Sequence, residues 1–403
     1  MLMVFSAVFR FVGISAVYTV YSGARSFRAS FVIYKAPLKI HCPNPARSFF
    51  RHSSQKFLTD AYSACGILVL TDEKISLPSM YTELLEVPTI KKEGFSAASG
   101  NKEGKFIMKK TVFTGAATAL ITPFDKRGKI DYGKFAELVE FQISEGINAL
   151  VVAGTTGEAS TFGDDEHRDV ISFVVKQTNG RVPVIAGAGS NDTVYAKGLV
   201  EHACDAGADA VLLVTPYYNK TTQKGLVRMY TELADASQKP VILYNVPSRT
   251  GVNIEPQTYL ELAAHPNIVG FKEANGNMGK IVQTAALVDG KLDMYSGNDD
   301  QIVPLLSLGG KGVISVLSNL MPAKTVEICD RFFRGDTEGS RRLQLELLPL
   351  INALFCEVNP IPVKAAMARL GYTENVLRSP LYPMEEEHEE LLVRQMKACG
   401  LAV

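Results

Sequence analysis

Residues 268–272 read Ile-Val-Gly-Phe-Lys (IVGFK), a short apolar run that ends on a lysine. The run is part of a pattern repeated after residue 108: a β-branched apolar segment, then glycine or proline, then an amphipathic helical stretch. Eight such segments occur, at 116–121, 149–152, 184–186, 210–214, 241–244, 268–271, 292–295 and 313–316. Strands that alternate with helices pair in parallel through crossover connections, and eight units predict a closed (β/α)8 TIM barrel of the α/β class.

Amphipathic stretches typical of helices separate these segments, at 132–144, 164–178, 193–206, 223–237 and 280–288. Four more follow the eighth segment, at 321–334, 338–355, 362–370 and 385–398. Because closure of a barrel does not require so many, we predict a catalytic barrel over 108–335 and a C-terminal helical region over 336–403. An open doubly wound sheet is the rival fold, but Thr122-Pro123-Phe124-Asp125 stands where its Gly-x-Gly-x-x-Gly turn would follow the first strand.

The first 107 residues have a different composition from the rest. They contain 13 Lys+Arg and 7 Asp+Glu, although the whole chain is balanced at 42 and 42. A basic, serine-rich segment without an acidic residue before Asp60 is typical of an organelle transit peptide. However, 102–104 (Lys-Glu-Gly) can be encoded as AAGGAGG, a bacterial ribosome-binding sequence, shortly before Met108. Our hypothesis is that Met108 is the initiator of a cytoplasmic protein and that 1–107 come from a start assigned too far upstream; a targeting leader is the alternative.

Composition excludes several classes of function. A net charge of zero is not that of a nucleic-acid-binding protein, which needs an excess of basic residues. Residues 1–20 are apolar but are interrupted by Arg10, so they fall short of the roughly 20 apolar residues of a membrane span. The six cysteines show no CxxC spacing, which argues against both a zinc site and a disulfide framework. We therefore expect no metal, nucleic-acid or membrane partner.

Lys272 is the unusual residue at a strand end. Strand alternation predicts that Lys272, Gly270 and Ile268 share one face, with Val269 and Phe271 on the other. The latter pair suits the helix-covered outside, so we expect Lys272 to point into the barrel, near the strand ends that carry catalytic groups in this fold. Gly270 beneath it would leave space for the lysine stem. Burial disfavours a charged ammonium, and a neutral amine can attack a carbonyl. The position therefore favours a Schiff-base lysine.

A salt bridge to a carboxylate is the alternative for Lys272. Glu273 is adjacent, but consecutive strand residues face opposite ways. Tyr244 ends the neighbouring strand, about 4.8 Å away, so its phenol can reach the Lys272 amine and relay protons. Thr155 and Tyr218, which follow the second and fourth strands, are candidates for the same relay. The ordinary alternatives are that the threonine caps a helix and that the tyrosine packs.

Histidines and acidic residues give no clear site. His167, His202 and His265 fall in helical or helix-end contexts, so we expect them at the surface and predict no general-base histidine. The acidic run 164–166 precedes His167 and could suggest a metal site. It also opens a helix, where acidic side chains interact favourably with the helix dipole, and metal-ligand spacing is missing.

Five motifs closely resemble, in order and spacing, those of the dihydrodipicolinate synthase family. They are 154–158 (GTTGE), 217–219 (YYN), 244–251 (YNVPSRTG), 271–274 (FKEA) and 359–364 (NPIPVK). The resemblance runs from about Phe113 to the C-terminus. It implies condensation of pyruvate with L-aspartate 4-semialdehyde to 4-hydroxy-tetrahydrodipicolinate, in the diaminopimelate route to L-lysine. It also implies a homotetramer built as a dimer of dimers, with no cofactor.

The resemblance also assigns roles to individual residues. Lys272 would form the Schiff base with pyruvate, and Tyr244 would donate and accept protons. Thr155 and Tyr218 would complete the relay, with Tyr218 reaching into a neighbouring subunit.

Further residues would bind the substrates. Thr156 and the backbone of Ile314 would hold the pyruvate carboxylate, and Gly297 would line the substrate site. Arg249 would bind the semialdehyde carboxylate, for which a guanidinium is suited.

Two departures from the family concern feedback inhibition. In the allosteric pocket of lysine-sensitive relatives, a Glu and a His or other large side chain stand where this chain has Tyr195 and Asp164. The other residues of that pocket are retained: Asn191, the carbonyl of Ser160 and Tyr217. Loss of the acidic partner removes a charge-assisted bond to the lysine ammonium, so we predict weak or absent inhibition.

The rivals within the superfamily are N-acetylneuraminate lyase and the 2-keto-3-deoxy-sugar acid aldolases. They share the barrel, the lysine and the tyrosine, but their polyhydroxy substrates are not expected to need Arg249 after Pro247-Ser248. A catalytically silent binding paralogue would be expected to have lost Lys272 or Tyr244, and both are present.

Overall fold

The computed structural model describes residues 3–11, 14–23, 26–35 and 109–403. The chain divides into two compact units, Met1–Gly100 and Asn101–Val403. The first unit contains one antiparallel sheet of three strands, β1 (Met3–Phe11), β2 (Ile14–Gly23) and β3 (Ser26–Lys35), in that order. These strands are not among the elements predicted above, and the coding motif before Met108 lies outside the described residues.

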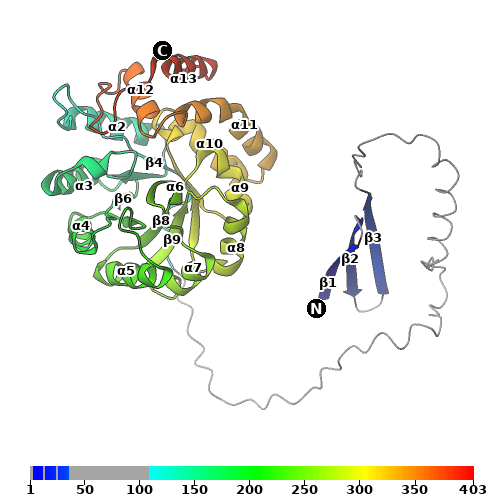
Figure 1. Ribbon diagram of the computed structural model, residues 1–403. Coiled ribbons are helices and arrows are strands. Elements are labelled where there is room, and N and C mark those ends of the chain that lie inside the picture. Colours follow the sequence, from blue (N-terminus) through cyan, green and yellow to red (C-terminus); the bar gives the residue numbers. More distant parts are fainter. Residues whose placement is uncertain (1–2, 12–13, 24–25, 36–108) are drawn as a thin grey trace, which may run out of the picture. The chain divides into compact units, whose positions relative to one another are not determined.

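The second unit is the predicted closed barrel of eight parallel strands with helices around it (Figure 1). The strands are β4 (Gly115–Ala119), β5 (Ala149–Val152), β6 (Val184–Gly187), β7 (Ala210–Val214), β8 (Val241–Asn245), β9 (Ile268–Glu273), β10 (Asp293–Ser296) and β11 (Gly312–Ser315). The barrel closes because β11 pairs with β4. The fold prediction is therefore confirmed, and each predicted apolar segment overlaps its strand.

Helices follow the strands in sequence and surround them. They are α2 (Tyr132–Ser144), α3 (Asp164–Thr178), α4 (Thr193–Asp205), α5 (Gln223–Ala236), α6 (Pro247–Thr250), α7 (Pro256–Leu262), α8 (Met278–Val288), α9 (Ile302–Ser307) and α10 (Pro322–Phe333). Short 3₁₀ turns lie at 159–161, 299–301 and 317–319. Among the described residues, no helix has the length and hydropathy needed to span a bilayer.

Alternating strand residues fill two separate layers. On β8, Ile242 and Tyr244 belong to the cluster inside the barrel, whereas Leu243 belongs to the larger layer between strands and helices. Small residues such as Ala117 and Ala149 also point inward, which leaves room in the interior for larger side chains. The period-two pattern of the sequence therefore determines which side chains face the interior.

Strand β9 breaks this alternation with a bulge, and the predicted faces were partly wrong. Val241 pairs with Ile268 but Ile242 pairs with Gly270, so Val269 is an extra residue on β9. Val269 lies in the inner cluster and Ile268 in the outer layer, opposite to the prediction. Lys272 still points inward because the bulge lies before it.

The glycine beneath Lys272 also has a different role from the one expected. A Cβ atom at Gly270 would come within 2.6 Å of the Asp293 carbonyl on β10. Gly270 therefore permits close approach of the neighbouring strand, rather than only providing space for the lysine stem.

The N-terminal end of the barrel is closed by the segment that precedes β4. The Lys109 ammonium donates to the carbonyls of Ala263 and Ile268, both at 2.6 Å. Burial lowers the pKa of Lys109 to about 8. The Phe113 ring stacks on Tyr295, whose hydroxyl donates to the Phe113 carbonyl. These contacts tie residues from 109 onward to the barrel.

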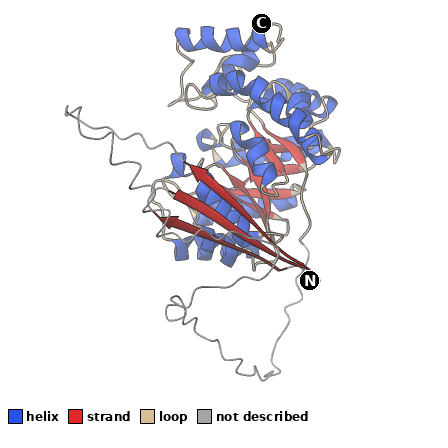
Figure 2. Ribbon diagram, turned by 90° about the vertical axis from the view of Figure 1, so that its right-hand side faces the viewer, coloured by secondary structure: helices blue, strands red, loops and turns tan. Residues whose placement is uncertain are grey.

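Three further helices follow α10: α11 (Thr337–Leu354), α12 (Ile361–Arg369) and α13 (Glu386–Ala398). Buried side chains of all three belong to the same core layer as the barrel helices. In Figure 2, the C-terminal end of the chain and its last helices lie at one side of the barrel.

A buried ion pair connects α12 to the loop after β5. The Lys364 ammonium lies 2.7 Å from Glu158 Oε1, and both side chains are fully buried. Lys364 Nζ also lies 3.9 Å from the centre of the Phe124 ring, and burial lowers the pKa of Lys364 to about 8. A buried charge that loses its partner is costly, so each side chain depends on the other.

A variant that starts at Met108 is predicted to keep the free energy of unfolding and the activity of the full chain. The reason is that residues 109–403 supply the barrel, the Lys109 contacts and the C-terminal helices. Denaturant unfolding and turnover of the two forms test this. A loss of more than about 1 kcal/mol in the shorter form would contradict the prediction.

Lys364→Met is predicted to lower the free energy of unfolding by about 3–5 kcal/mol, because it leaves the Glu158 carboxylate buried and unpaired. The double variant Lys364→Met/Glu158→Gln should recover most of the loss, since neither charge remains. Lys324→Met is the control, because the Lys324–Glu327 pair is largely exposed and should contribute less than about 1 kcal/mol. Equal instability of the single and double variants would contradict the prediction.

Candidate active site

Lys272 lies at the carboxyl end of β9 and points into the barrel. It is 6% exposed, and its Nζ atom lies 4.4 Å from the centre of the Tyr244 ring. The strand register explains this contact, because Tyr244 of β8 pairs directly with Lys272 of β9. No carboxylate of the described residues is within salt-bridge distance of Lys272. The salt-bridge alternative is therefore not what the structure shows.

Glu273 faces away from Lys272, as strand alternation predicts. Its fully buried carboxyl accepts hydrogen bonds from Asn245 and Tyr259 on the outer side of the sheet. The two neighbouring residues thus have separate surroundings.

A cavity of about 340 Å³ opens beside Tyr244 at the carboxyl ends of β5 to β8. Thr155, from the loop after β5, lines it together with Tyr244 of β8 and Arg249 of α6, the short helix after β8. The Lys272 Nζ atom lies over the Tyr244 ring, but Lys272 does not line this cavity itself. The cavity therefore brings three of the predicted site residues to one place, next to the buried amine.

Thr155 belongs to a tightly held loop after β5. Two nearby non-glycine residues, Ala153 and Glu158, have left-handed φ angles of 55° and 56°. The side chain of Thr155 caps none of the described helices: Glu158 precedes the short turn at 159–161, and Gly163 precedes α3. The capping alternative for Thr155 is therefore wrong.

Thr156 is buried and is oriented by a residue from the C-terminal region. The Asn359 amide Nδ2 donates to Thr156 Oγ1 at 3.0 Å. Because Oγ1 accepts this bond, the Thr156 hydroxyl proton is available to another acceptor. The backbone carbonyl of Asn359 accepts a hydrogen bond from Arg249 Nη2 at 2.9 Å. Asn359 therefore holds the side chains of both Thr156 and Arg249. The sequence contains Asn359 in the 359–364 motif, but its spacing gives no indication of this role.

Gly297 lies next to the Lys272 stem, and Ile314 lies elsewhere in the barrel interior. A Cβ atom at Gly297 would lie 3.1 Å from Lys272 Cε and 3.0 Å from the Glu273 carbonyl, so a side chain there would press on the lysine stem. Ile314, on β11, is fully buried and belongs to the inner cluster.

Tyr218 is not brought to the other site residues within this chain. It is 93% exposed and has a φ angle of 66°. This loop tyrosine therefore does not pack against the described residues of its own chain.

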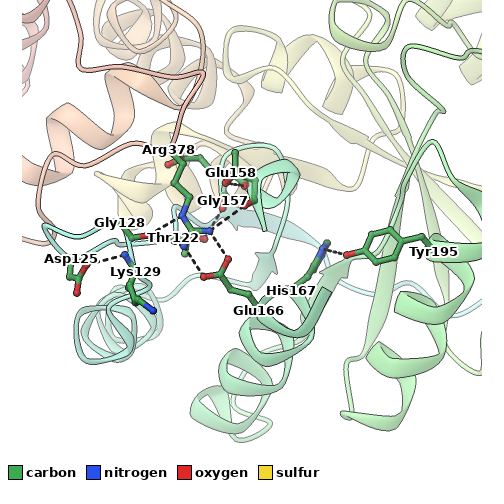
Figure 3. Close-up of polar contacts among 11 residues, drawn as sticks. Thr122, Asp125, Gly128, Lys129, Gly157, Glu158, Glu166, His167, Tyr195 and Arg378 are labelled. Atoms are coloured by element: carbon green, nitrogen blue, oxygen red, sulfur yellow. Dashed lines mark hydrogen bonds and ion pairs between the residues drawn. The ribbon is translucent and has the colours of Figure 1, made fainter. Parts of the chain in front are cut away.

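Arg378 holds together the loops beside the site (Figure 3). Its guanidinium donates to the carbonyls of Gly128 and Thr161 and pairs with Glu166 of α3, with Nη2 2.7 Å from Glu166 Oε1. Its backbone N–H donates to Glu158 Oε2 at 3.0 Å. Arg378 thus joins the loops after β4 and β5 to the start of α3, a role that sequence spacing did not indicate.

The surface placement predicted for His167 is wrong. His167 is 5% exposed, and its Nε2 donates to the Gly187 carbonyl at 2.8 Å, which leaves Nδ1 to accept from the Tyr195 hydroxyl at 3.5 Å (Figure 3). Burial lowers the pKa of His167. The signal that could have revealed it is the helical spacing of His167 with the buried Val170, Ile171 and Val174.

The acidic run 164–166 opens α3, as predicted. Asp164 pairs with Arg168 and Glu166 with Arg378. Among the described residues, no three His, Cys, Asp or Glu side chains gather in a manner that could hold a metal ion.

The site combines an enclosed amine, a phenol next to it, hydroxyls in the loop after β5 and a guanidinium at the cavity. An amine that attacks a carbonyl needs nearby groups to transfer protons. Hydroxyl and guanidinium donors bind carboxylates. The arrangement is therefore suited to Schiff-base chemistry on carboxylate-bearing carbonyl compounds.

Comparison with known proteins gives a consistent family. The model of the dihydrodipicolinate synthetase family matches residues 112–399. A 4-hydroxy-tetrahydrodipicolinate synthase of Acetivibrio thermocellus is 53% identical over 295 residues, which is 73% of this chain and 100% of that protein. One of Lachnoclostridium phytofermentans is 53% identical over 72% of this chain and 99% of that protein.

Solved structures agree with this assignment. The dihydrodipicolinate synthase of Thermotoga maritima has a TM-score of 0.71 at 44% identity and covers 72% of this chain and 100% of its own. The chloride-inhibited enzyme of Acinetobacter baumannii, solved with pyruvate, has a TM-score of 0.71 at 42% identity, with the same coverage. The chain therefore belongs to the dihydrodipicolinate synthetase family.

Proposed function

We propose that this protein is a 4-hydroxy-tetrahydrodipicolinate synthase, which condenses pyruvate with L-aspartate 4-semialdehyde in L-lysine biosynthesis. The observation that carries the proposal is the Lys272 amine, enclosed at the carboxyl end of β9 and in contact with the Tyr244 ring. The names of the relatives and the pyruvate bound in the related A. baumannii structure support the same reaction.

The first half of the reaction attaches pyruvate to the enzyme. The Lys272 amine attacks the pyruvate C2 carbonyl to give a carbinolamine, which loses water to form a protonated imine. Loss of a proton from C3 then gives the enamine. Each step moves a proton, and Tyr244 is the acid and base next to the amine, with Thr155 and Tyr218 as further members of the relay.

The second half joins the substrates and frees Lys272. The enamine carbon attacks the aldehyde of the semialdehyde, which forms the new C–C bond and leaves a hydroxyl group. The amino group of the semialdehyde portion then attacks the imine carbon, closes the ring and displaces Lys272. One water is lost in total, and there is no net oxidation or reduction. Because the Lys272 imine activates pyruvate, the reaction needs no external cofactor.

Carboxylate binding explains the remaining site residues. Thr156, whose hydroxyl proton is left available by the Asn359 bond, and the Ile314 backbone would hold the pyruvate carboxylate. Gly297 would keep the space next to the Lys272 stem open for substrate. Arg249, held by the Asn359 carbonyl, would bind the semialdehyde carboxylate.

The exposure of Tyr218 supports assembly of the protein as a homotetramer. An exposed tyrosine in a strained loop is suited to enter a site on a neighbouring subunit, so each site would need two chains. A dimer of dimers would provide that exchange.

Borohydride treatment in the presence of pyruvate is predicted to fix pyruvate on Lys272, because reduction traps the imine. Peptide mapping by mass spectrometry locates the adduct. Lys272→Met should form no adduct. Lys109→Met is the matched control and should still form it, because Lys109, whose pKa burial lowers to about 8, lies at the opposite end of the barrel.

An adduct at another lysine, or none in the unmodified protein, would overturn the proposed function. Coupled turnover with the semialdehyde then separates this synthase from the N-acetylneuraminate lyases and sugar acid aldolases, which would not convert it. The position of Arg249 beside the cavity supports the synthase.

Inhibition by L-lysine is predicted to be weak or absent. Tyr195 lines the cavity next to His167 and brings no carboxylate to an ammonium group, and Asp164 pairs with Arg168. Tyr195→Glu should increase inhibition by introducing a charge-assisted bond. Steady-state rates across lysine concentrations test both statements, and half-inhibition of the unmodified protein at micromolar lysine would contradict the first.

A further inference from the structure

A second polar cluster lies directly behind the two proposed catalytic side chains, on the outer face of the same strands. Tyr244 pairs with Lys272 across β8 and β9, and the next pair in the register is Asn245 with Glu273. The Asn245 amide Nδ2 lies 2.9 Å from Glu273 Oε1 and 3.2 Å from Oε2. Both side chains are fully buried. On the inner face of the two strands, Tyr244 and Lys272 therefore carry the proposed chemistry. On the outer face, Asn245 and Glu273 form a side-chain hydrogen bond between the strands.

Glu273 receives donors from two further segments. The Tyr259 hydroxyl of α7 donates to Oε2 at 3.0 Å, and the Asn275 backbone N–H, in the loop after β9, donates to Oε1 at 2.9 Å. No cation of the described residues pairs with Glu273. Three donor groups converge on one carboxyl, which suits an ionised carboxylate because it only accepts.

Asn245 is equally constrained. Its Oδ1 accepts from the Ile254 N–H at 3.0 Å, and its Nδ2 also donates to Asn253 Oδ1 at 2.9 Å. Residues 253 and 254, before α7, therefore orient the Asn245 amide, and this amide in turn orients the Glu273 carboxylate. Every polar atom of the Asn245 side chain has a partner, so the cluster has one arrangement.

We propose that Glu273 is a positioning residue for the reaction proposed above: its carboxylate binds Asn245 across the strand pair and thereby holds Tyr244 and Lys272 opposite each other. The inference rests on the proposed function of Lys272. A buried carboxylate without a paired cation costs stability even when it accepts hydrogen bonds, and a neutral acceptor would avoid that cost. A glutamine could not replace it equally, since its amide N–H would face one of the three donors.

The protonation state of Glu273 follows from its surroundings. Burial raises its pKa to about 7, opposed by the bonds from Asn275, Tyr259 and Asn245. The titratable groups around it are Tyr259 of α7, which has Tyr230 of α5 near it, and Lys272 on the other face of β9. The Glu255–Lys280 ion pair joins the edge of the cluster through Asn253.

Protonation of Glu273 is therefore expected to weaken the cluster. Below about pH 7 the carboxyl gains a proton and becomes a donor where its three neighbours require an acceptor. The bond to Asn245 then weakens, and with it the alignment of Tyr244 and Lys272. Burial of the ionised Glu273 carboxylate lowers the free energy of unfolding above this pH. This destabilisation disappears as the pH falls and the carboxyl gains its proton.

Glu273→Gln tests the inference. It is expected to lower kcat and the rate constant for borohydride-trapped adduct formation by roughly ten- to a hundredfold, because small misplacements of reacting groups are costly. The KM for pyruvate should change little. The unfolding midpoint at pH 8 should also change little, because removal of a buried charge offsets the cost of an amide N–H that faces a donor. Glu338→Gln is the matched control: the same change in the half-exposed Glu338–Arg341 pair of α11, outside this cluster, should leave kcat unaltered.

The pH profile provides a readout that a purely structural role would not change. The ratio of the trapping rate constants, unmodified protein over Glu273→Gln, should decrease from pH 8 to pH 6, because the unmodified side chain becomes neutral as well. A ratio that is constant over this range, or a Glu273→Gln protein that traps pyruvate at the unmodified rate, overturns the inference.

Tyr259→Phe keeps the test decisive if Glu273→Gln does not fold. It removes one donor to Glu273 and retains the aromatic packing on Phe271, whose ring centre is 4.5 Å away. Slower trapping at unchanged stability supports the inference, and an unmodified trapping rate overturns it. If the unmodified protein forms no adduct at Lys272, the proposed function fails; an adduct with equal rates in the variants overturns only the role of Glu273.

Discussion

The hydrogen-bonded register between β8 and β9 is the constraint on which the site depends. Two parallel strands that pair residue by residue place Tyr244 against Lys272 on the inside and Asn245 against Glu273 on the outside. Backbone pairing alone would allow side chains to adopt several rotamers, but buried partners on both faces leave few choices. The enclosed amine is therefore a product of strand pairing rather than of a flexible loop.

Around this pair, the C-terminal region supplies what the barrel strands do not. Asn359 holds Thr156 and Arg249, Lys364 pairs with Glu158, and Arg378 joins three segments near the start of α3. The helices and loops of this region are more than an addition to a complete barrel, because they hold the loop that carries two of the proposed substrate-handling hydroxyls.

Much of this architecture could be predicted from sequence because it follows from local patterns. Buried parallel strands read as short apolar runs, so each was located to within a few residues, and the inward direction of Lys272 followed from alternation. The bulge at Val269 could not be seen, since an extra residue changes the pairing partner without changing the apolar character of the run. The burial of His167 was not predicted, because its position at a helix start indicates exposure whereas its helical spacing with Val170 indicates a buried face.

Contacts between distant parts of the chain were not predictable by the same means. The sequence shows Lys364 within a motif, yet nothing local indicates that it pairs with Glu158, 206 residues earlier. The exposure of Tyr218 likewise depends on the conformation of one loop, with a positive φ angle that sequence spacing does not report.

The Lys364–Glu158 pair also has a consequence for synthesis of the protein. A ribosome that adds about 5–20 residues per second needs roughly 10–40 s to extend from Glu158 to Lys364. Through that interval the loop after β5 has emerged without its cation, while the strands around it can already begin to pair. Because α12 carries Lys364, it must leave the exit tunnel before this ion pair can form, so the nascent chain acquires this part of its site only near the end of translation.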